Sequence, residues 1–244
     1  MSGAEVVLIS KGAQDVYIQD KFSSKVNISQ YSRVTNFAQR AIQCPWQNGD
    51  NITKNQLSIV KIPRRGDILT YMWLEGNDIV KSLEGTTFSL YLGGQQIDSQ
   101  TFDYMADIWQ IYMAENESKS KTINNLISQS NKNFFPLHFF FCDHEMFIPL
   151  VALQYYELEI HINWGNHITN NTKPILYGNF VLLDNHERNY LSKNRLDFLI
   201  TQVQRIPFSN SGNKINLRPF NHPIKALFFG FASSNADPTT DKWT

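Results

Sequence analysis

Two carboxylates and an imidazole alternate with apolar side chains in the middle of the chain. Glu157, Glu159 and His161 are two residues apart, and Tyr156, Leu158, Ile160 and Ile162 occupy the other positions. On a strand, side chains two apart share a face about 6.5–7 Å apart, so two carboxylates could act together on a glycosidic bond. Such pairs must flank the bond, however, and usually face each other across a cleft. The alternation is typical of an antiparallel strand with one wet face, so we interpret this row as solvated and Tyr156 as buried.

The histidines and cysteines provide a test for a metal site. Cys142-Asp143-His144-Glu145 brings several ligand types together, but no second histidine follows at the spacing of a zinc-protease helix. No His-x-His pair occurs, and the remaining histidines, which are His138, His161, His167, His186 and His222, show no pattern. The sequence therefore predicts no metal ligands.

Motifs for nucleophilic or phosphate chemistry are also missing. The chain has neither a Gly-x-Ser-x-Gly elbow nor a phosphate-binding G-x-x-x-x-G-K-[ST] loop. The short basic stretch from Lys61 to Arg65 could touch nucleic acid, but in a neutral chain it is better interpreted as a solvated turn. We predict no catalytic residue, no bound cofactor and no enzymatic activity.

Composition narrows the class of protein further. The 244 residues include 22 basic and 22 acidic side chains, only 18% of residues are charged, and Phe (17) and Tyr (10) are frequent. A nucleic-acid-binding protein normally carries a basic excess, so direct nucleic-acid binding is not expected. A weakly charged surface associates readily, which is compatible with assembly.

Cysteine usage and the N-terminus indicate an intracellular protein without a membrane span. Cys44 and Cys142 permit one disulfide, although two unpaired thiols in a reducing compartment fit better. The N-terminus lacks the cationic and apolar regions of a signal peptide. No window approaches the roughly 18–20 apolar residues that a membrane span requires.

Strand patterns dominate the chain. Segments rich in β-branched and aromatic residues, separated by Gly, Pro, Asn or Asp, predict strands at Arg33–Cys44, Gln56–Ile62, Asp67–Leu74, Thr87–Leu92, Phe134–Cys142, Leu150–Trp164, Ile175–Leu183, Phe198–Ile206, Lys214–Arg218 and Ile224–Phe231. Gly93-Gly94 predicts a two-residue hairpin turn that leads into Gln95–Asp98, because glycine tolerates the positive φ angles of such turns. Phe134–Cys142 is apolar at nearly every position, which indicates a strand buried on both faces or at a subunit contact.

Helical periodicity is scarce. Thr101–Glu115 has apolar residues at three- and four-residue spacing and predicts a helix, Thr122–Gln129 predicts a shorter one, and Ser192 is a candidate N-cap for a turn over Ser192–Asp197. Many short strands with one helical insertion, and no strand–helix–strand rhythm, predict an all-β antiparallel sandwich.

Several short motifs follow one another along the chain: Gly12–Tyr17, Thr35–Ala38, Gly93–Asp98, Pro136–Phe141, Ile148–Glu159, Leu182–Arg188 and Asn221–Lys225. In this order they resemble motifs of the major capsid proteins of large icosahedral nucleocytoplasmic double-stranded DNA viruses of the chlorella virus and iridovirus type. Two positions depart from the family pattern: Ile28–Arg33 stands where Phe-Phe-Lys and an Arg pair are usual, and Tyr156 replaces a histidine.

The resemblance implies a double jelly roll, three copies of which form a pseudo-hexagonal capsomer. Residues 1–20 are then an N-terminal arm, residues 21–191 a first jelly roll, and residues 192–244 a linker with the opening strands of an incomplete second jelly roll, so that the chain is shortened after the first. The insertion Ser99–Asn133 is expected to project toward a neighbour or the capsomer top.

The function implied is that of a structural virion protein. The chain, or a shortened paralogue, would form homotrimers that tile an icosahedral capsid shell after assembly in the host cell cytoplasm. Its partners would be neighbouring capsomers, minor capsid proteins, or a separate chain that supplies the second jelly roll. Two alternatives stay open: a minor virion or scaffold protein on the same fold, and a carbohydrate-binding jelly roll or jelly-roll enzyme.

Overall fold

The computed structural model describes residues 36–49, 52–109, 134–143, 146–169, 171–206 and 217–229. The chain divides into two compact units, Met1–Phe37 and Ala38–Thr244. Apart from Phe37, where the first strand begins, every element described below belongs to the second unit.

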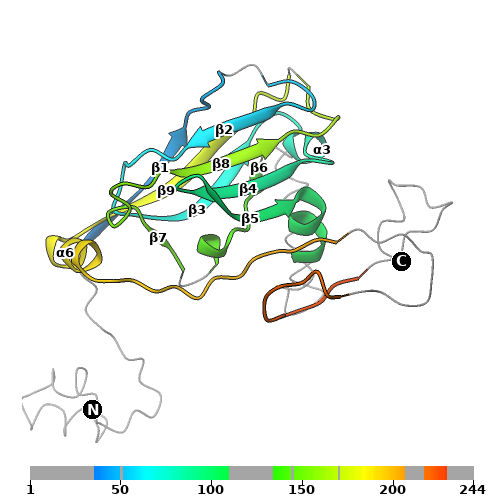
Figure 1. Ribbon diagram of the computed structural model, residues 1–244. Helices are drawn as coiled ribbons and strands as arrows, with labels where there is room; N and C mark the ends of the chain where they lie inside the picture. The colour runs from blue at the N-terminus through cyan, green and yellow to red at the C-terminus, as the bar shows by residue number, and fades with distance from the viewer. Residues whose placement is uncertain are drawn as a thin grey trace, which may run out of the picture. The chain divides into compact units, whose positions relative to one another are not determined.

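Nine strands and short helices make up the described part of the chain (Figure 1). The strands are β1 (Phe37–Cys44), β2 (Leu57–Lys61), β3 (Ile68–Glu75), β4 (Thr87–Leu92), β5 (Gln95–Thr101), β6 (Phe134–Pro136), β7 (Ile148–Pro149), β8 (Leu158–Asn163) and β9 (Ile175–Leu183). The helices are α3 (Ile79–Ser82), the π-helix η1 (Tyr104–Trp109), the 3-10 helix η2 (Phe140–Cys142) and α6 (Asn185–Lys193).

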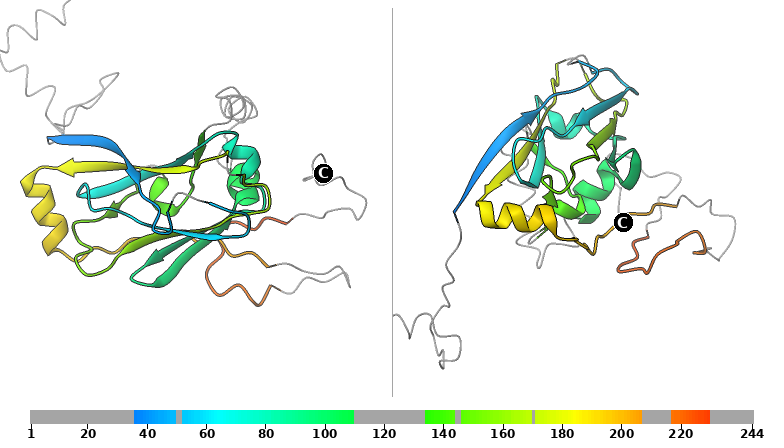
Figure 2. Two further views of the ribbon diagram at one scale, coloured as in Figure 1. Left: turned by 90° about the horizontal axis from the view of Figure 1, so that it is seen from above. Right: turned by 60° about the vertical axis from the view of Figure 1, so that its left-hand side comes forward.

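The strands form two antiparallel sheets that face each other (Figures 1 and 2). One sheet has the order β1-β9-β3-β6, with β7 also paired to β3, and the other has the order β2-β8-β4-β5. Because β6 pairs with Trp73–Glu75 and β7 with Ile68–Leu69, the two short strands occupy one position beside β3. Counted in this way the sheet orders are 1-8-3-6 and 2-7-4-5, which is the strand order of an eight-stranded jelly roll. The expected antiparallel sandwich is confirmed.

The core lies between the sheets and follows the alternation of the sequence. In β8 the side chains of Leu158, Ile160 and Ile162 are buried, and Ile160 is opposite Val60 on one side and Leu90 on the other. A single apolar cluster joins both sheets through large side chains that are almost completely buried, among them Phe88, Phe135, Phe139, Phe141, Trp164 and Phe180.

Several predicted strands are confirmed closely. β4 and β9 have the predicted bounds, and β2 and β3 differ from prediction by one residue at either end. Gly93 and Gly94 form the predicted turn between β4 and β5, with φ angles of 59° and 80°.

The predicted strand Phe134–Cys142 is wrong beyond Pro136. The pairing with β3 continues only to the Leu137 N–H, which donates to the Met72 carbonyl, and the chain then turns into η2. The turn directs both Phe139 and Phe141 into the core, which explains the apolar pattern without a two-faced strand.

The predicted strand Leu150–Trp164 begins too early. The Ala152 N–H bonds to the Pro149 carbonyl and the Leu153 N–H to the Leu150 carbonyl, so residues 150–157 form a turn and a loop before β8. Tyr156 lies in this loop and is 61% exposed. The expectation that Tyr156 belongs to the buried face is therefore wrong.

Strands predicted after α6 are not formed in the described residues. Residues 195–206 and 217–229 contain no strand, which contradicts Phe198–Ile206 and the described parts of Lys214–Arg218 and Ile224–Phe231. The physical reason lies at β5, where hydrogen bonds that involve side chains take the place of the backbone hydrogen bonds that would pair two strands. The Val203 N–H donates to the Asp98 carboxylate, and the Gln202 amide donates to the Ile97 carbonyl.

The helix predictions have mixed outcomes. Residues 102–109 are helical, mostly as the π-helix η1, which confirms the start of Thr101–Glu115, while residues 110–115 and Thr122–Gln129 lie outside the described residues. The predicted turn Ser192–Asp197 is wrong, because α6 begins earlier with Asp184 as N-cap and places Ser192 in its last turn. No helix within these described ranges is long and apolar enough to cross a membrane.

Candidate functional site

The polar row of β8 is a charged, partly covered sheet face. The Glu159 carboxylate lies 2.9 Å from the His161 Nε2, and the His161 ring stacks on Tyr91 with centroids 4.0 Å apart. Lys61 of the neighbouring strand β2 contacts Glu157 closely and lies 3.8 Å from Glu159. The hydrogen bond to Glu157 raises the pKa of Lys61. Because these carboxylates share one face and bind a lysine and a histidine, they do not flank a cleft as a glycosidase pair would.

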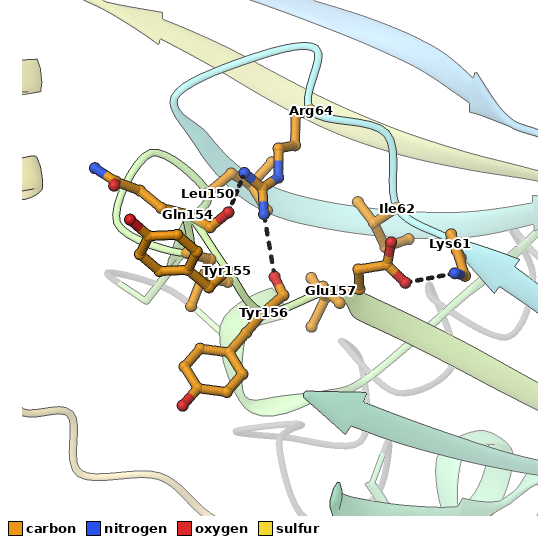
Figure 3. A pocket seen from close by; sticks show the side chains of 10 residues that line it. Lys61, Ile62, Arg64, Leu150, Gln154, Tyr155, Tyr156 and Glu157 are labelled. Carbon is orange, nitrogen blue, oxygen red and sulfur yellow. Dashed lines mark hydrogen bonds and ion pairs between the residues drawn. The ribbon is translucent and has the colours of Figure 1, made fainter. Parts of the chain in front are cut away.

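Beside this row lies a surface pocket of about 310 Å³ (Figure 3). Buried apolar side chains, Ile62, Leu150 and Leu158, contribute to its lining together with the half-buried Leu153. The polar lining residues are Lys61, Arg64, Gln154, Tyr155, Tyr156 and Glu157. The volume is at the lower end of the range for ligand sites, so it suits a side chain or a short peptide better than a larger molecule.

Two contacts hold the loop that forms one wall of the pocket. Arg64 donates to the carbonyls of Gln154 at 3.0 Å and Tyr156 at 3.3 Å, and Figure 3 shows its guanidinium reaching across to both. The Tyr156 ring lies over Gly93 of the β4–β5 turn so closely that a Cβ there would be 2.3 Å from Tyr156 Cδ1. The loop is thus fixed to both of its neighbours before any ligand binds.

A buried carboxylate joins the start of β3 to α6. The Asp67 side chain accepts hydrogen bonds from Arg188 Nε at 2.9 Å, Arg188 Nη2 at 3.0 Å and the Leu183 N–H at 2.8 Å. The hydrogen bonds to Asp67 raise the pKa of Arg188. Asp184 caps α6 by accepting from the Asn185 N–H at 2.7 Å. A paired carboxylate of this kind fixes structure rather than a substrate.

A second buried carboxylate joins β5 to the segment after α6. Asp98 accepts from the N–H groups of Val203 and Ser99, both at 2.9 Å, and from the Gln100 amide at 2.6 Å. Burial raises the pKa of Asp98, and these hydrogen bonds oppose the shift. The Gln100 amide also donates to the His138 carbonyl, so three separate segments meet at this point.

Those candidate metal ligands that lie in the described residues are far apart from one another. His138 stacks on Trp109 with centroids 3.6 Å apart, and burial lowers the pKa of His138 to about 3. Within the described ranges, no three His, Cys, Asp or Glu residues gather closely enough to hold a metal. His144 and Glu145 lie outside those ranges. Burial raises the pKa of Asp143, and the positive charge of Lys225 opposes this shift.

The other singled-out residues are also apart. His161 is in β8, His186 is in α6, and His167 lies 3.8 Å from Glu84. Cys44 and Cys142 are free thiols, and burial raises the pKa of each to about 12. Sequence reasoning missed Arg64, Asp67 and Asp98 as contact-forming residues. Of these three, only Asp98 belongs to one of the motifs, Gly93–Asp98, and no sequence signal marked the contacts of Arg64 or Asp67.

Comparisons with known proteins agree with this jelly roll. Residues 80–175 match the family model described as "Major capsid protein N-terminus". The major capsid protein of Pyramimonas orientalis virus is 27% identical over 94% of this chain and 65% of its own length, and that of Paramecium bursaria Chlorella virus 1 is 28% identical over 93% and 60%. Capsid protein 1 of Acanthamoeba polyphaga mimivirus is 25% identical over 94% of this chain and 48% of its own.

Solved structures show the same fold. The VP54 protein of the chlorella virus PBCV-1, fitted into a reconstruction of the virophage Sputnik, has a TM-score of 0.60 at 21% identity and covers 73% of this chain and 50% of its own. The Faustovirus major capsid protein has a TM-score of 0.53 at 9% identity, covering 76% and 61%.

The fold is therefore a jelly roll. The chain is similar along most of its length to major capsid proteins of large DNA viruses, the family that its motifs resemble. It spans about half to two thirds of the length of these relatives.

Proposed function

We propose that this chain is a structural subunit of a viral capsid shell, a major capsid protein or a shortened paralogue of one. The observation that carries the proposal is the jelly-roll strand order in a chain whose relatives over 93–94% of its length are named as capsid proteins. The role assigned is structural, with no reaction, no cofactor and no direct contact with nucleic acid.

The proposal includes a homotrimer that forms a pseudo-hexagonal capsomer and packs against neighbouring capsomers in the virion. Three copies around an axis use head-to-tail contacts, in which two different surfaces of each copy meet and close a ring. The sandwich supports this role, because its short strands and hydrogen-bonded loops form a surface that is already ordered before copies associate. Assembly in the host cytoplasm belongs to the same proposal.

The domain division remains a proposal as well. Residues 1–20 would form an arm, residues 21–191 the jelly roll, and residues 192–244 a linker with the opening part of a second jelly roll. Exposed apolar side chains in the last region, Leu217, Ile224, Leu227, Phe228 and Phe229, support this division. A second jelly roll, on this chain or another, would cover such residues, and so would a minor capsid protein.

Electron microscopy of the purified protein tests the assembly. Class averages should show particles with threefold symmetry and a roughly hexagonal outline. If only single subunits without symmetry are seen, even at high protein concentration, the result would count against the proposal. Binding to a glycan array together with such monomers would favour the carbohydrate-binding alternative.

A further inference from the structure

The 310 Å³ pocket next to β8 carries one positive charge that has no carboxylate partner among the described residues. Of its two cations, Lys61 is bound to Glu157, whereas the bonds of Arg64 go to two backbone carbonyls. An arginine has five N–H donors in a planar fork, so Arg64 can still bind a carboxylate. The pocket thus combines an apolar lining with an anion-binding group at its rim.

The pocket also has two properties of a preformed binding surface, an exposed aromatic side chain and a loop that is already held in place. Tyr155 at its edge is 90% exposed, and a large exposed aromatic side chain beside an apolar hollow is typical of a protein interface. Because Arg64 and Gly93 already hold the loop, little conformational entropy is lost when a ligand binds. Figure 3 shows Arg64 on one side of the hollow and Glu157 with Ile62 on the other.

A matching surface lies on the segment after α6. Phe198 packs edge-to-face against Phe147 with ring centroids 5.6 Å apart. Phe198 itself is 38% exposed, and in a drawn-out segment the residues on either side of it point the other way. The Asp197 side chain is accordingly 77% exposed, and Leu199 is 95% exposed. A carboxylate and an apolar side chain are therefore presented together, about 6.5–7 Å apart.

The carboxylate of Asp197 is available for exchange. Its partner Arg195 lies 3.1 Å away, and both side chains are largely exposed. Ion pairs of this kind contribute little to stability, so an arginine of a second copy can replace Arg195 at small cost.

We propose that this pocket binds the segment Asp197–Leu199 of a second copy of the chain. Leu199 enters the apolar hollow beneath Tyr155, and Asp197 binds the guanidinium of Arg64. The contact joins two different surfaces, so it is head-to-tail and can close into a ring of copies. The inference rests on the proposed function, because it assigns one of the contacts through which shell subunits associate.

Charge reversal tests the ion pair. Asp197→Arg and Arg64→Asp should each weaken self-association roughly tenfold in sedimentation experiments, and the double variant should restore it, since the reversed charges pair again. Arg65→Asp is the matched control, because Arg65 is an exposed neighbour that does not line the pocket. It should associate as the unchanged protein does. Single variants that associate normally, or a double variant that is not restored, would overturn the proposal.

Cross-linking gives a second readout that does not depend on Arg64, whose replacement also releases the loop. Proteins carrying Tyr155→Cys and Leu199→Cys are mixed under mild oxidation, and a disulfide-linked heterodimer is expected. Tyr155→Cys mixed with Leu182→Cys, a half-exposed apolar position on β9, is the control and should not cross-link. Cys44 is buried and Cys142 is half-buried, and because the pKa of each thiol is raised both add little background.

The outcomes separate this inference from the proposed function. If the unchanged protein forms trimers but no Tyr155–Leu199 cross-link appears, the pocket assignment is wrong and the shell role stands. If the unchanged protein remains a monomer at every concentration, the shell role fails and this contact fails with it.

Discussion

At the residue scale, two buried carboxylates explain why particular motif positions carry the residues they do. Asp67 binds Arg188 across 121 positions of sequence, and Asp98 binds the Val203 N–H across 105. Both carboxylates accept several hydrogen bonds, so each ties a strand of the sandwich to a segment that follows β9. The motif Leu182–Arg188 thus supplies the helix cap Asp184 and the partner of Asp67.

Replacing Asp67 by alanine should destabilise the fold by about 2–3 kcal/mol, because a charged acceptor of three hydrogen bonds is lost and the Leu183 N–H is left without its partner. Urea unfolding measures the change. His167→Ala, which removes only an exposed pair with Glu84, is the control and should change the free energy of unfolding by less than about 0.5 kcal/mol. Equal effects of the two substitutions would contradict the role given to Asp67.

His138 should make stability depend on pH. Its pKa is lowered from 6.5 to about 3 in the folded protein, so the folded state resists protonation and stability is lost as pH falls below about 6.5. From pH 7 to pH 5 this loss is about 2 kcal/mol. His138→Phe keeps a ring against Trp109 and should lose less over the same interval in urea unfolding.

Asp98 acts with the opposite sign, because its pKa is raised in the folded protein: stability is gained as pH falls from that raised pKa to the ordinary value near 3.8. The comparison between unchanged protein and His138→Phe removes this shared contribution. An identical loss of stability in the two proteins would show that His138 is accessible to protons in the folded state.

At the element scale, the sequence predicts strands best where periodicity and a turn residue coincide. The alternation of β8 predicted the buried Leu158, Ile160 and Ile162 correctly. On the opposite face, Glu159 and His161 were expected to be solvated, but only 19% and 18% of their side chains are exposed. Prediction failed where long-range contacts override the local pattern. Tyr156 continues the same alternation, yet Arg64, 92 positions away, holds its backbone in a loop. The strand prediction after α6 failed because the Val203 N–H donates to Asp98 rather than to a neighbouring strand, a contact that no local pattern shows.

The β4–β5 turn offers a matched pair of glycine substitutions. Both Gly93 and Gly94 have positive φ angles, but only at Gly93 would a Cβ meet the Tyr156 ring, while Gly94 has nothing within 4 Å. Gly94→Ala should cost about 1 kcal/mol from backbone strain, and Gly93→Ala about 1 kcal/mol more. Unfolding experiments in a Tyr156→Ala background should abolish the difference. A difference that persists there would mean that the Tyr156 contact does not cause it.

The segment after α6 should be released when Asp98 is replaced. Asp98→Ala removes the acceptor of the Val203 N–H, so trypsin should cleave at the nearby Arg205 several times faster than in unchanged protein. Ser89→Ala, which removes a half-buried side-chain contact within the same sheet, is the control and should leave the cleavage rate unchanged. Equal cleavage rates in all three proteins would show that Asp98 does not hold the segment.

At the scale of the whole molecule, the jelly roll provides two sheets and a set of preformed surfaces, and the proposed capsid role depends on how copies associate. The motifs indicated the fold and the similarity to capsid proteins from the sequence alone. They could not indicate the pocket, because its lining residues come from two segments, 61–64 and 150–158, that only the paired strands bring together.

The mass of the protein in solution tests the capsid role most directly. Light scattering over a range of concentrations should give a species of three times the 28.2 kDa of the chain, because the proposed contacts close into a ring of three. A mass of 28.2 kDa at every concentration would contradict the account, since a shell subunit must associate with its own kind.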